Sequence, residues 1–265
     1  MRASVRAIFI VPFTEGFEGG VPCLYNDVRG KTTIAFGNLC NMPGDAAALP
    51  LMHPGGIPAT TAQKIAAWHR VHDDPGGAQG GWRHSAKLTD LRLTREAMTA
   101  LAMRRADANN AILIQRLPDF EDFNACAQLA LHSWAWAGGA ADPYPHMFAA
   151  LLERDFAVAA VEIFMKEVTP EGIRNTGLVP RNVANRILMK NAARVDAFKL
   201  NPDMIEWRID LTVSEEDTLP SLTNPPSIPP STGGTVYVAT PRRDVTGSGG
   251  TSHPFPDEPP PDDDA

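Results

Sequence analysis

The sequence predicts an α+β protein that is mostly helical, with a small N-terminal β-hairpin or sheet, a helical body and a disordered tail. Apolar residues recur at helical spacing over most of residues 94–198. Strand-forming and turn-forming residues cluster in residues 24–38. From Asn201 the composition changes, and half of the 24 prolines fall in the last 65 residues. Such a segment buries too little apolar surface to offset its ordering entropy, which predicts disorder.

The first predicted elements are a short helix and a hairpin. Residues 8–18 read IFIVPFTEGFE, and the two glycines that follow are expected to stop the helix. Residues 24–38 read LYNDVRGKTTIAFGN, in which residues 27–30 predict a turn. Residues 32–36 predict the returning strand, which the next glycine ends.

Residues 39–92 are rich in Gly, Pro, His and small residues, and we interpret them as an insertion beside the core fold. They contain one stretch with helical spacing, TTAQKIAAWHRVH, in which Ile65, Trp68 and Val71 recur on one side. A single helix is therefore predicted in this region.

The helical body begins after the insertion. Thr94 is a good N-cap for a helix that Pro118 ends. Residues 119–139 are apolar on nearly every side, which predicts a central buried helix stopped by two glycines. Further helices are predicted in residues 145–155, 156–168 and 181–195. The buried face of the first helix is predicted to carry Ala97, Met98, Leu101, Ala108 and Ile112.

Domain organisation follows from the same change in composition. Residues 1–200 are predicted to form one domain, and residues 201–265 an acidic, Pro-rich tail. Within the tail, residues 204–213 alternate apolar and polar side chains, which is typical of a strand or an extended arm. The tail is either a docking segment or a solubilising one, and its composition fits both roles.

Charge excludes nucleic acid as the main partner. Residues 1–200 carry 21 Lys and Arg against 19 Asp and Glu, whereas residues 201–265 carry 3 against 12. The net charge of −7 therefore belongs to the tail, and the nearly neutral body implies no basic face.

The N-terminus predicts neither a membrane span nor a cleaved signal peptide. The apolar stretch in residues 7–13 is far shorter than the roughly 20 residues that cross a bilayer, and a proline interrupts it. Two arginines precede this stretch, but no small-residue cleavage site follows it. We expect the protein to be made in the cytoplasm without a clear signal.

Cysteines and histidines give no metal prediction. Cys23, Cys40 and Cys126 are too few and too scattered for a zinc site, although Cys23 and Cys40 would be able to pair in an oxidising compartment. The alternative is that they are small buried thiols. Four histidines in residues 39–92 show no tight spacing with acidic ligands. No metal and no cofactor are predicted.

Two carboxylates of the N-terminal region are candidates for acid and base chemistry. Glu18 lies at the end of the predicted first helix, and Asp27 lies in the predicted hairpin turn. Glycoside hydrolysis needs one carboxyl group that gives a proton to the leaving oxygen and a second that stays ionised. Taken singly, each residue would be read as an ordinary surface or turn residue.

The spacing of eight positions resembles the phage-type lysozyme family. That family has Glu-Gly, then Tyr, Asp, Gly, Thr-Ile and Gly at fixed distances, and this chain matches them without a gap. Later stretches also resemble the family: LTREAMTAL, SWAWAGG and GLVPRNVAN. The matching positions are Glu18, Gly19, Tyr25, Asp27, Gly30, Thr33, Ile34 and Gly37.

The resemblance implies three catalytic residues. Glu18 corresponds to the general acid, Asp27 to the carboxylate that places or activates water, and Thr33 to the hydroxyl that orients this water. The family's reaction inverts the configuration of the sugar. Glu15 is the alternative acid because TEGFEG contains two Glu-Gly pairs, but its spacing to Asp27 is twelve rather than nine.

Substrate-binding residues are implied less directly. Leu39 and Asn38 follow the predicted strand, and Trp136 lies at a position that lines the saccharide cleft in the family; it is either a sugar-stacking or a core residue. The chain departs from the family at four positions. Ala35 replaces a usual Gly, Asn38 an often-found His, Ala137 a common amide residue, and Asn185 an often-found Glu.

The expected function is a peptidoglycan hydrolase, a muramidase that cleaves the β-1,4 bond between N-acetylmuramic acid and N-acetylglucosamine. On this interpretation residues 1–200 are a lysozyme-like catalytic domain. The insertion and the acidic tail favour an antibacterial toxin that acts in the periplasm or cell wall after delivery, with an immunity protein or a secretion-apparatus component as partner. The alternatives are a phage endolysin, a non-catalytic peptidoglycan-binding module and a transglycosylase-type lyase.

Overall fold

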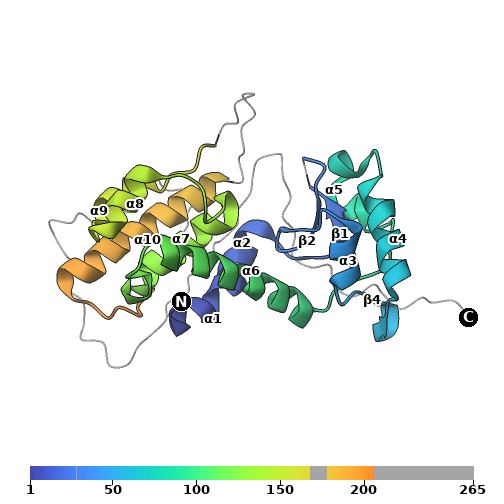
Figure 1. Ribbon diagram of the computed structural model, residues 1–265, viewed down its shortest axis with the longest axis horizontal. Coiled ribbons are helices and arrows are strands. Elements are labelled where there is room, and N and C mark those ends of the chain that lie inside the picture. Colours follow the sequence, from blue (N-terminus) through green and yellow to red (C-terminus); the bar gives the residue numbers. More distant parts are fainter. Residues whose placement is uncertain (28, 168–177, 206–265) are drawn as a thin grey trace, which may run out of the picture. The chain divides into compact units, whose positions relative to one another are not determined.

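The computed structural model describes residues 1–27, 29–167 and 178–205 (Figure 1). These residues form a mostly helical protein with small antiparallel sheets, which confirms the predicted α+β class. The predicted tail lies outside the described residues from position 206 onward, and so does most of the arm predicted in residues 204–213.

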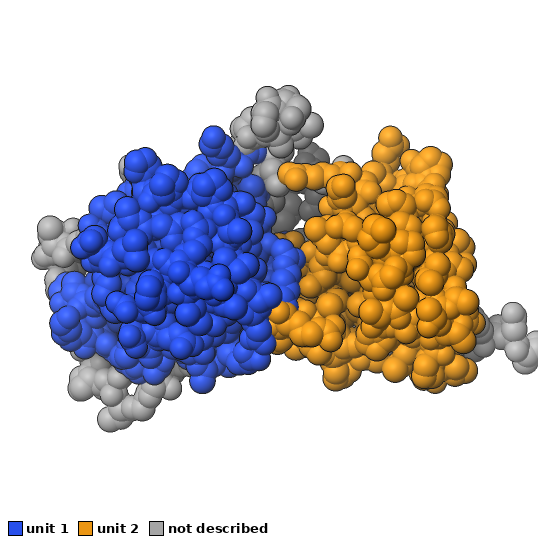
Figure 2. Space-filling model, in the orientation of Figure 1, with its two compact units in different colours: residues 1–17, 105–245 blue, residues 18–104, 246–265 orange. Residues whose placement is uncertain are grey.

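The described chain divides into two compact units (Figure 2). One contains residues 1–17 and the described residues from Arg105 onward. The other contains residues 18–104 and therefore holds both the predicted hairpin and the predicted insertion. The boundary passes through a long helix, α6 (Arg95–Arg116), between Arg104 and Arg105.

The predicted first helix is broken into three segments. Its middle segment, a wider π-helical turn, is interrupted at Val11, where the backbone is extended at φ −132° and ψ 122°. Val11 precedes Pro12, and the proline ring disfavours helical backbone at the residue before it. Helical structure ends at Glu18, and Gly19 follows with φ +66°, as the sequence predicts. The segments are α1 (Ala3–Ile8), η1 (Phe9–Thr14) and α2 (Glu15–Glu18).

The predicted hairpin is present and carries a third strand that the sequence analysis does not predict. The strands β1 (Val21–Asn26), β2 (Thr32–Ala35) and β3 (Asn38–Leu39) form an antiparallel sheet in the order β1-β2-β3. The turn between β1 and β2 closes with a hydrogen bond from Gly30 N to Asp27 O of 2.9 Å. A two-residue connection, Phe36 and Gly37, joins β2 to β3. Because β3 has only two residues, it does not show as a separate element in the sequence.

The insertion predicted in residues 39–92 folds as part of the same unit. Its helices α4 (Thr61–His72) and α5 (Gly77–Ser85) both contact β1, and α3 (Pro43–Ala48) packs on α4 (Figure 1). The predicted helix is α4, and Thr60 caps it through a hydrogen bond from Gln63 N. The other elements were not predicted. They are α3 (Pro43–Ala48), β4 (Met52–His53), η2 (Pro54–Gly56), β5 (Ile57–Pro58) and α5 (Gly77–Ser85); α4 spans Thr61–His72.

Helix α6 is capped by Thr94, whose Oγ1 accepts from Ala97 N at 3.2 Å. The prediction of which α6 residues are buried is largely wrong. Ala108 is exposed, and only Met98 of the predicted set is fully buried. Alanine occurs on several sides of this helix, so apolar spacing alone does not identify the packed side. The buried positions are Met98, Ala102, Ala106 and Leu113.

The central helix of the other unit is α7 (Ala125–Gly138), and it confirms the predicted buried helix. Every residue from Ala125 to Trp136 is buried. The helix begins after Asn124, whose side chain accepts from Ala127 N, and ends at Gly139, where φ is +105°. It packs on α1 and η1 and on the last helix, α10 (Leu178–Phe198).

Two shorter helices complete this unit. They are α8 (Pro145–Leu152) and α9 (Phe156–Glu162), which pack on each other, and α9 also contacts α10. Within the described ranges no helix combines the length and the apolar character that a bilayer crossing requires.

Candidate functional site

The candidate residues lie on a three-stranded sheet whose two faces differ. Tyr25 pairs with Thr33, which in turn pairs with Leu39. Directly paired residues of antiparallel strands point to the same face, so these three side chains share one face of the sheet. By the same register, Asn26 with Thr32 belongs to the opposite face.

The Asn26 face is locked to the helices of the insertion. The Asn26 side chain donates from Nδ2 to Val71 O at 2.7 Å, at the end of α4. Its Oδ1 accepts from Thr32 Oγ1 at 3.0 Å, and the same hydroxyl lies 3.0 Å from His72 Nδ1. Because the Thr32 proton points to Asn26, Nδ1 of His72 is the donor to Thr32. These hydrogen bonds hold β1 and β2 against α4.

The helix α5 adds a close backbone approach to this lock. Gly77 lies so near Asn26 that a Cβ atom on it would collide with Asn26 Nδ2 and stand 3.2 Å from Asn26 Cβ and Cγ. Only glycine fits at this point of contact. Asn26 directly precedes Asp27, so the lock fixes the base of the turn that carries the candidate carboxylate.

The Asp27 carboxylate is held by the turn itself. Its Oδ1 accepts from the backbone N–H groups of Arg29 and Lys31, each at 2.8 Å. This is the arrangement in which an Asp side chain stabilises a turn. The second oxygen, Oδ2, accepts no hydrogen bond from the residues that the structure describes. Asp27 therefore has a fixed position and one oxygen left for a water molecule.

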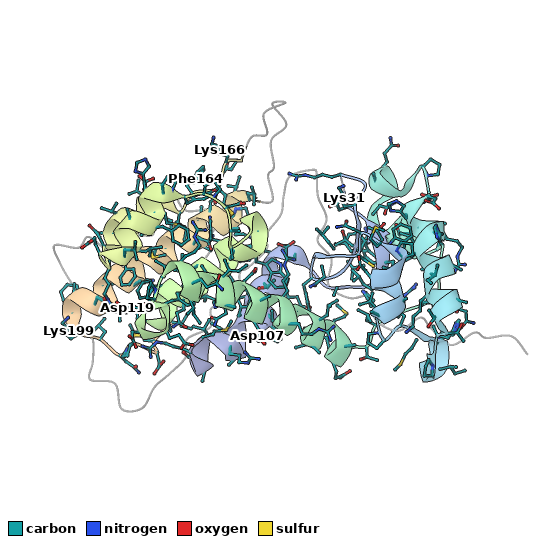
Figure 3. The ribbon with its side chains drawn as sticks, in the orientation of Figure 1. Lys31, Asp107, Asp119, Phe164, Lys166 and Lys199 are labelled. Carbon is teal, nitrogen blue, oxygen red and sulfur yellow. The ribbon has the colours of Figure 1, made fainter. Side chains whose placement is uncertain are left out.

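Thr33 is tied to the same turn through Lys31. The Lys31 carbonyl accepts from Asp27 N at 2.9 Å and from Thr33 Oγ1 at 2.9 Å. Figure 3 labels Lys31 at this end of the hairpin. Since the Thr33 proton is used on Lys31 O, the hydroxyl oxygen is left as an acceptor. A water molecule that donates one proton to Thr33 Oγ1 and the other to Asp27 would direct its lone pairs away from both residues.

Glu18 meets the sheet at the connection between β2 and β3. A Cβ atom on Gly37 would lie 3.3 Å from Glu18 Oε2, so this carboxylate oxygen is close to the Gly37 backbone. Gly37 has φ +78°, and Ala35, two residues earlier, has φ +57°. Both values lie in the left-handed region that favours glycine, and the bare Gly37 leaves room for the carboxylate. Glu18 itself is exposed.

Tyr25 links the two carboxylates electrostatically. Burial is the main cause that raises the pKa of its phenol, and the negative charges of Glu18 and then Asp27 raise it further. Both carboxylates therefore lie within electrostatic range of the Tyr25 hydroxyl. The sequence motif includes Tyr25, but spacing alone assigned it no role.

The two residues predicted to bind substrate beside the strand separate onto opposite faces. Leu39 is 59% exposed and lies on the Thr33 face. Asn38 is only 6% exposed, and it pairs with Ile34 on the covered face. The alternation of side chains along β3 therefore argues against Asn38 as a substrate contact and leaves Leu39 in place.

Trp136 is a core residue of the α7 unit, which argues against the sugar-stacking alternative. Its side chain is 2% exposed. The Phe9 ring packs edge-on against it at 5.7 Å, and the Arg105 guanidinium lies 4.1 Å from the indole centre. An indole with both neighbours in contact has no face available for a sugar.

Other polar residues of this unit also have packing roles. Arg181 is buried and donates to Ser133 O and Oγ at 3.3 Å. The Asn182 amide bonds to both the N–H and the carbonyl of Met165, at 3.0 and 2.8 Å. These contacts hold the start of α10 to α7 and to the segment after α9.

The three cysteines are buried and unpaired, so no Cys23–Cys40 bond is present. Burial raises the pKa of the Cys23 and Cys40 thiols, and for Cys40 the value reaches about 12.

Three histidines of residues 39–92 each pair with one aspartate: His53 with Asp90, His69 with Asp73 and His84 with Asp74. Within the described part of the chain, no three His, Cys, Asp or Glu side chains group as metal ligands.

Two comparisons of the sequence with known proteins find no relative. A scan against protein-family models finds no match to this sequence, and a search of curated proteins finds none either. The interpretation of the site therefore rests on the residues and their geometry.

Proposed function

We propose that this protein is a peptidoglycan hydrolase of the muramidase type. The observation that carries the proposal is the pair of carboxylates around Tyr25. Glu18 lies at the β2–β3 connection and Asp27 in the β1–β2 turn, and Thr33 stands between these connections on the central strand. One carboxyl group, one fixed carboxylate and one acceptor hydroxyl are what hydrolysis of a glycosidic bond requires.

The residues would divide the reaction between them. Glu18 gives its proton to the glycosidic oxygen as the bond from the sugar C1 to that oxygen breaks. Asp27 Oδ2 and Thr33 Oγ1 hold the water that attacks C1 from the opposite side, and Asp27 takes the proton that this water releases. The attack inverts the sugar C1, and no cofactor takes part.

Exposure of Glu18 suits its role before substrate binds. An exposed carboxyl group exchanges protons with solvent freely between turnovers. A glycan strand laid over the Tyr25 face would remove water from Glu18. Asp27 keeps its two backbone N–H donors in the same complex, which holds the carboxylate in place.

The test is lysis of purified peptidoglycan, followed by loss of turbidity. Glu18→Gln and Asp27→Asn are each expected to reduce the rate by about 10² to 10⁴-fold, the usual contribution of a general acid or base. Glu15→Gln, from the neighbouring Glu-Gly pair, is the matched control and should retain activity. Circular dichroism of all three variants should match that of the unsubstituted protein.

Two outcomes would contradict the proposal. Wild-type rates of lysis in both Glu18→Gln and Asp27→Asn would remove these residues from the mechanism. A protein that sediments with peptidoglycan but releases no muropeptides would be a binding module. Mass spectrometry of released products distinguishes hydrolysis from a lyase reaction, which leaves an anhydro sugar.

A further inference from the structure

A second site of defined chemistry lies away from the carboxylates, in the same unit of the molecule. A cleft of about 380 Å³ opens between α4 and the loop of residues 86–92. Its lining includes three cationic side chains, Arg70, Lys87 and Arg92, against one carboxylate, Asp90. The cleft is shallow and open to solvent.

The walls of the cleft are held by arginine side chains. Arg92 donates from Nη1 to the carbonyls of Thr89 and Leu91, at 2.6 and 2.9 Å, and from Nη2 to Ala86 O at 3.1 Å. Its backbone pairs in both directions with that of Met52. Arg92 thus fixes the loop, and the cleft exists before any ligand enters.

Two other cations are left to bind a ligand. Arg70 uses Nε to donate to Leu88 O at 2.8 Å, which orients its guanidinium. Neither the Nη atoms of Arg70 nor Nζ of Lys87 form a hydrogen bond or an ion pair with any residue in the described ranges. Asp90 is already paired with His53 Nδ1 at 3.0 Å. The cleft therefore presents an oriented fork of donors and an ammonium group.

We propose that this cleft binds a carboxylate of the peptide stem of peptidoglycan. A guanidinium with both Nη groups available is matched to a carboxylate, and Lys87 adds a second charge. Ala86 and Leu88 provide apolar contacts for the methyl groups of alanine residues in the stem. Asp90, whose Oδ2 is paired with His53, has a second carboxylate oxygen that can accept from the amine of the diamino acid. The proposal rests on the proposed function, because it assumes that the glycan substrate carries peptides.

The experiment is a calorimetric titration of the full chain with free stem tetrapeptide, which contains no glycan to cut. The unsubstituted protein should bind the tetrapeptide, and Arg70→Gln combined with Lys87→Gln should weaken binding by about tenfold or more. Arg104→Gln, which removes an exposed cation elsewhere, is the control and should leave binding unchanged. Inorganic phosphate should bind more weakly than the tetrapeptide.

The outcomes separate this site from the proposed reaction. Cleavage of peptide-free glycan should be unchanged in the double variant, because neither substituted residue lies on the Tyr25 face. Loss of lysis on whole peptidoglycan in Glu18→Gln, with tetrapeptide binding retained, supports two separate sites. Absence of tetrapeptide binding at millimolar concentration, equal binding by the double variant, or phosphate binding as tight as tetrapeptide binding would each overturn the proposal.

Discussion

The two faces of the three-stranded sheet treat adjacent residues in opposite ways. On one face, Asn26 and Thr32 are buried and hydrogen-bonded to each other and to α4. On the other, Tyr25 lies within electrostatic range of two carboxylates, Thr33 is 3% exposed, and Leu39 is exposed. Sequence neighbours thus point to packed helices on one side and to the candidate carboxylates on the other, because side chains alternate along a strand.

The comparison also gives the predicted insertion a physical role. Its helices supply Val71 O, His72 and Gly77, which are the partners of the locked face. If Asp27 acts as proposed, its turn needs such support, because small displacements of catalytic groups are costly. Residues 39–92 therefore stabilise the strand that presents the candidate carboxylate.

The largest expected difference between the two faces comes from exchanging the adjacent threonines for valine, which keeps the side-chain shape. Thr33→Val removes the hydroxyl that would orient water, and we expect peptidoglycan lysis to fall about 100-fold with stability nearly unchanged. Thr32→Val instead leaves Asn26 Oδ1 and His72 Nδ1 without a partner, at a cost of about 1 to 3 kcal/mol. Urea unfolding and turbidity assays on both variants measure the difference. Equal effects of the two variants on lysis would remove the distinction between the faces.

Ala35 tests the connection that brings Glu18 to the sheet. It is buried and has φ +57°, so Ala35→Val should destabilise the protein by about 3 kcal/mol through left-handed backbone strain and overpacking. Ala35→Gly removes the strain but also a buried methyl group, and the change should stay within about 1 kcal/mol. Thermal unfolding of the pair measures this. A valine variant as stable as the glycine variant would contradict the assigned backbone conformation.

Gly77→Ala tests the locked face from the side of α5. The added methyl group meets Asn26, so the helix or the strand must shift, with an expected loss of about 2 kcal/mol. Gly44→Ala, where a Cβ atom meets nothing within 4 Å, is the control. If Gly77→Ala were no less stable than Gly44→Ala, the close approach of α5 to β1 would be refuted.

His132, in α7, extends the comparison to a buried polar group with one partner. Its Nε2 lies 3.2 Å from Asn110 Oδ1, Nδ1 has no partner in the described structure, and burial lowers its pKa to about 3. In the unfolded chain the His132 imidazole takes up a proton near pH 6.5, whereas in the folded protein it stays neutral at that pH. Stability from this residue is therefore present above pH 6.5 and is lost as the pH falls toward 3, by about 2 kcal/mol between pH 7 and pH 5.

Urea unfolding at these two pH values measures the loss. His132→Gln, which cannot be protonated, should show a smaller decrease over the same interval. An equal decrease in both proteins would assign the acid sensitivity to other groups.

Much of the fold could be predicted because strong local signals agree with the tertiary structure. The buried helix α7 has apolar residues on all sides, and α4 has a capping pair, Thr60 and Gln63. Helix α5 was missed because it contains three glycines, which have low helix propensity. Gly77 is explained by its close approach to Asn26 of β1, and Gly81 by its φ of +61°, neither of which local sequence reveals.

The candidate site was predictable in part for a similar reason. Spacing selected Glu18, Asp27 and Thr33 as candidates, but it carries no information about which side chain of a two-residue strand is covered. Asn38 was therefore placed at the site, although the register turns it to the covered face. Whether Trp136 faced sugar or core depended on Phe9 and Arg105, which are distant in sequence.

The central claim is that Glu18 and Asp27 act on a glycan from opposite sides with water between them. Proton NMR of the first product released from peptidoglycan tests this most directly, because it records the configuration at the new reducing end before the anomers equilibrate. The account predicts the α-anomer of N-acetylmuramic acid at this end. Initial release of the β-anomer, or of an anhydro sugar, would contradict it.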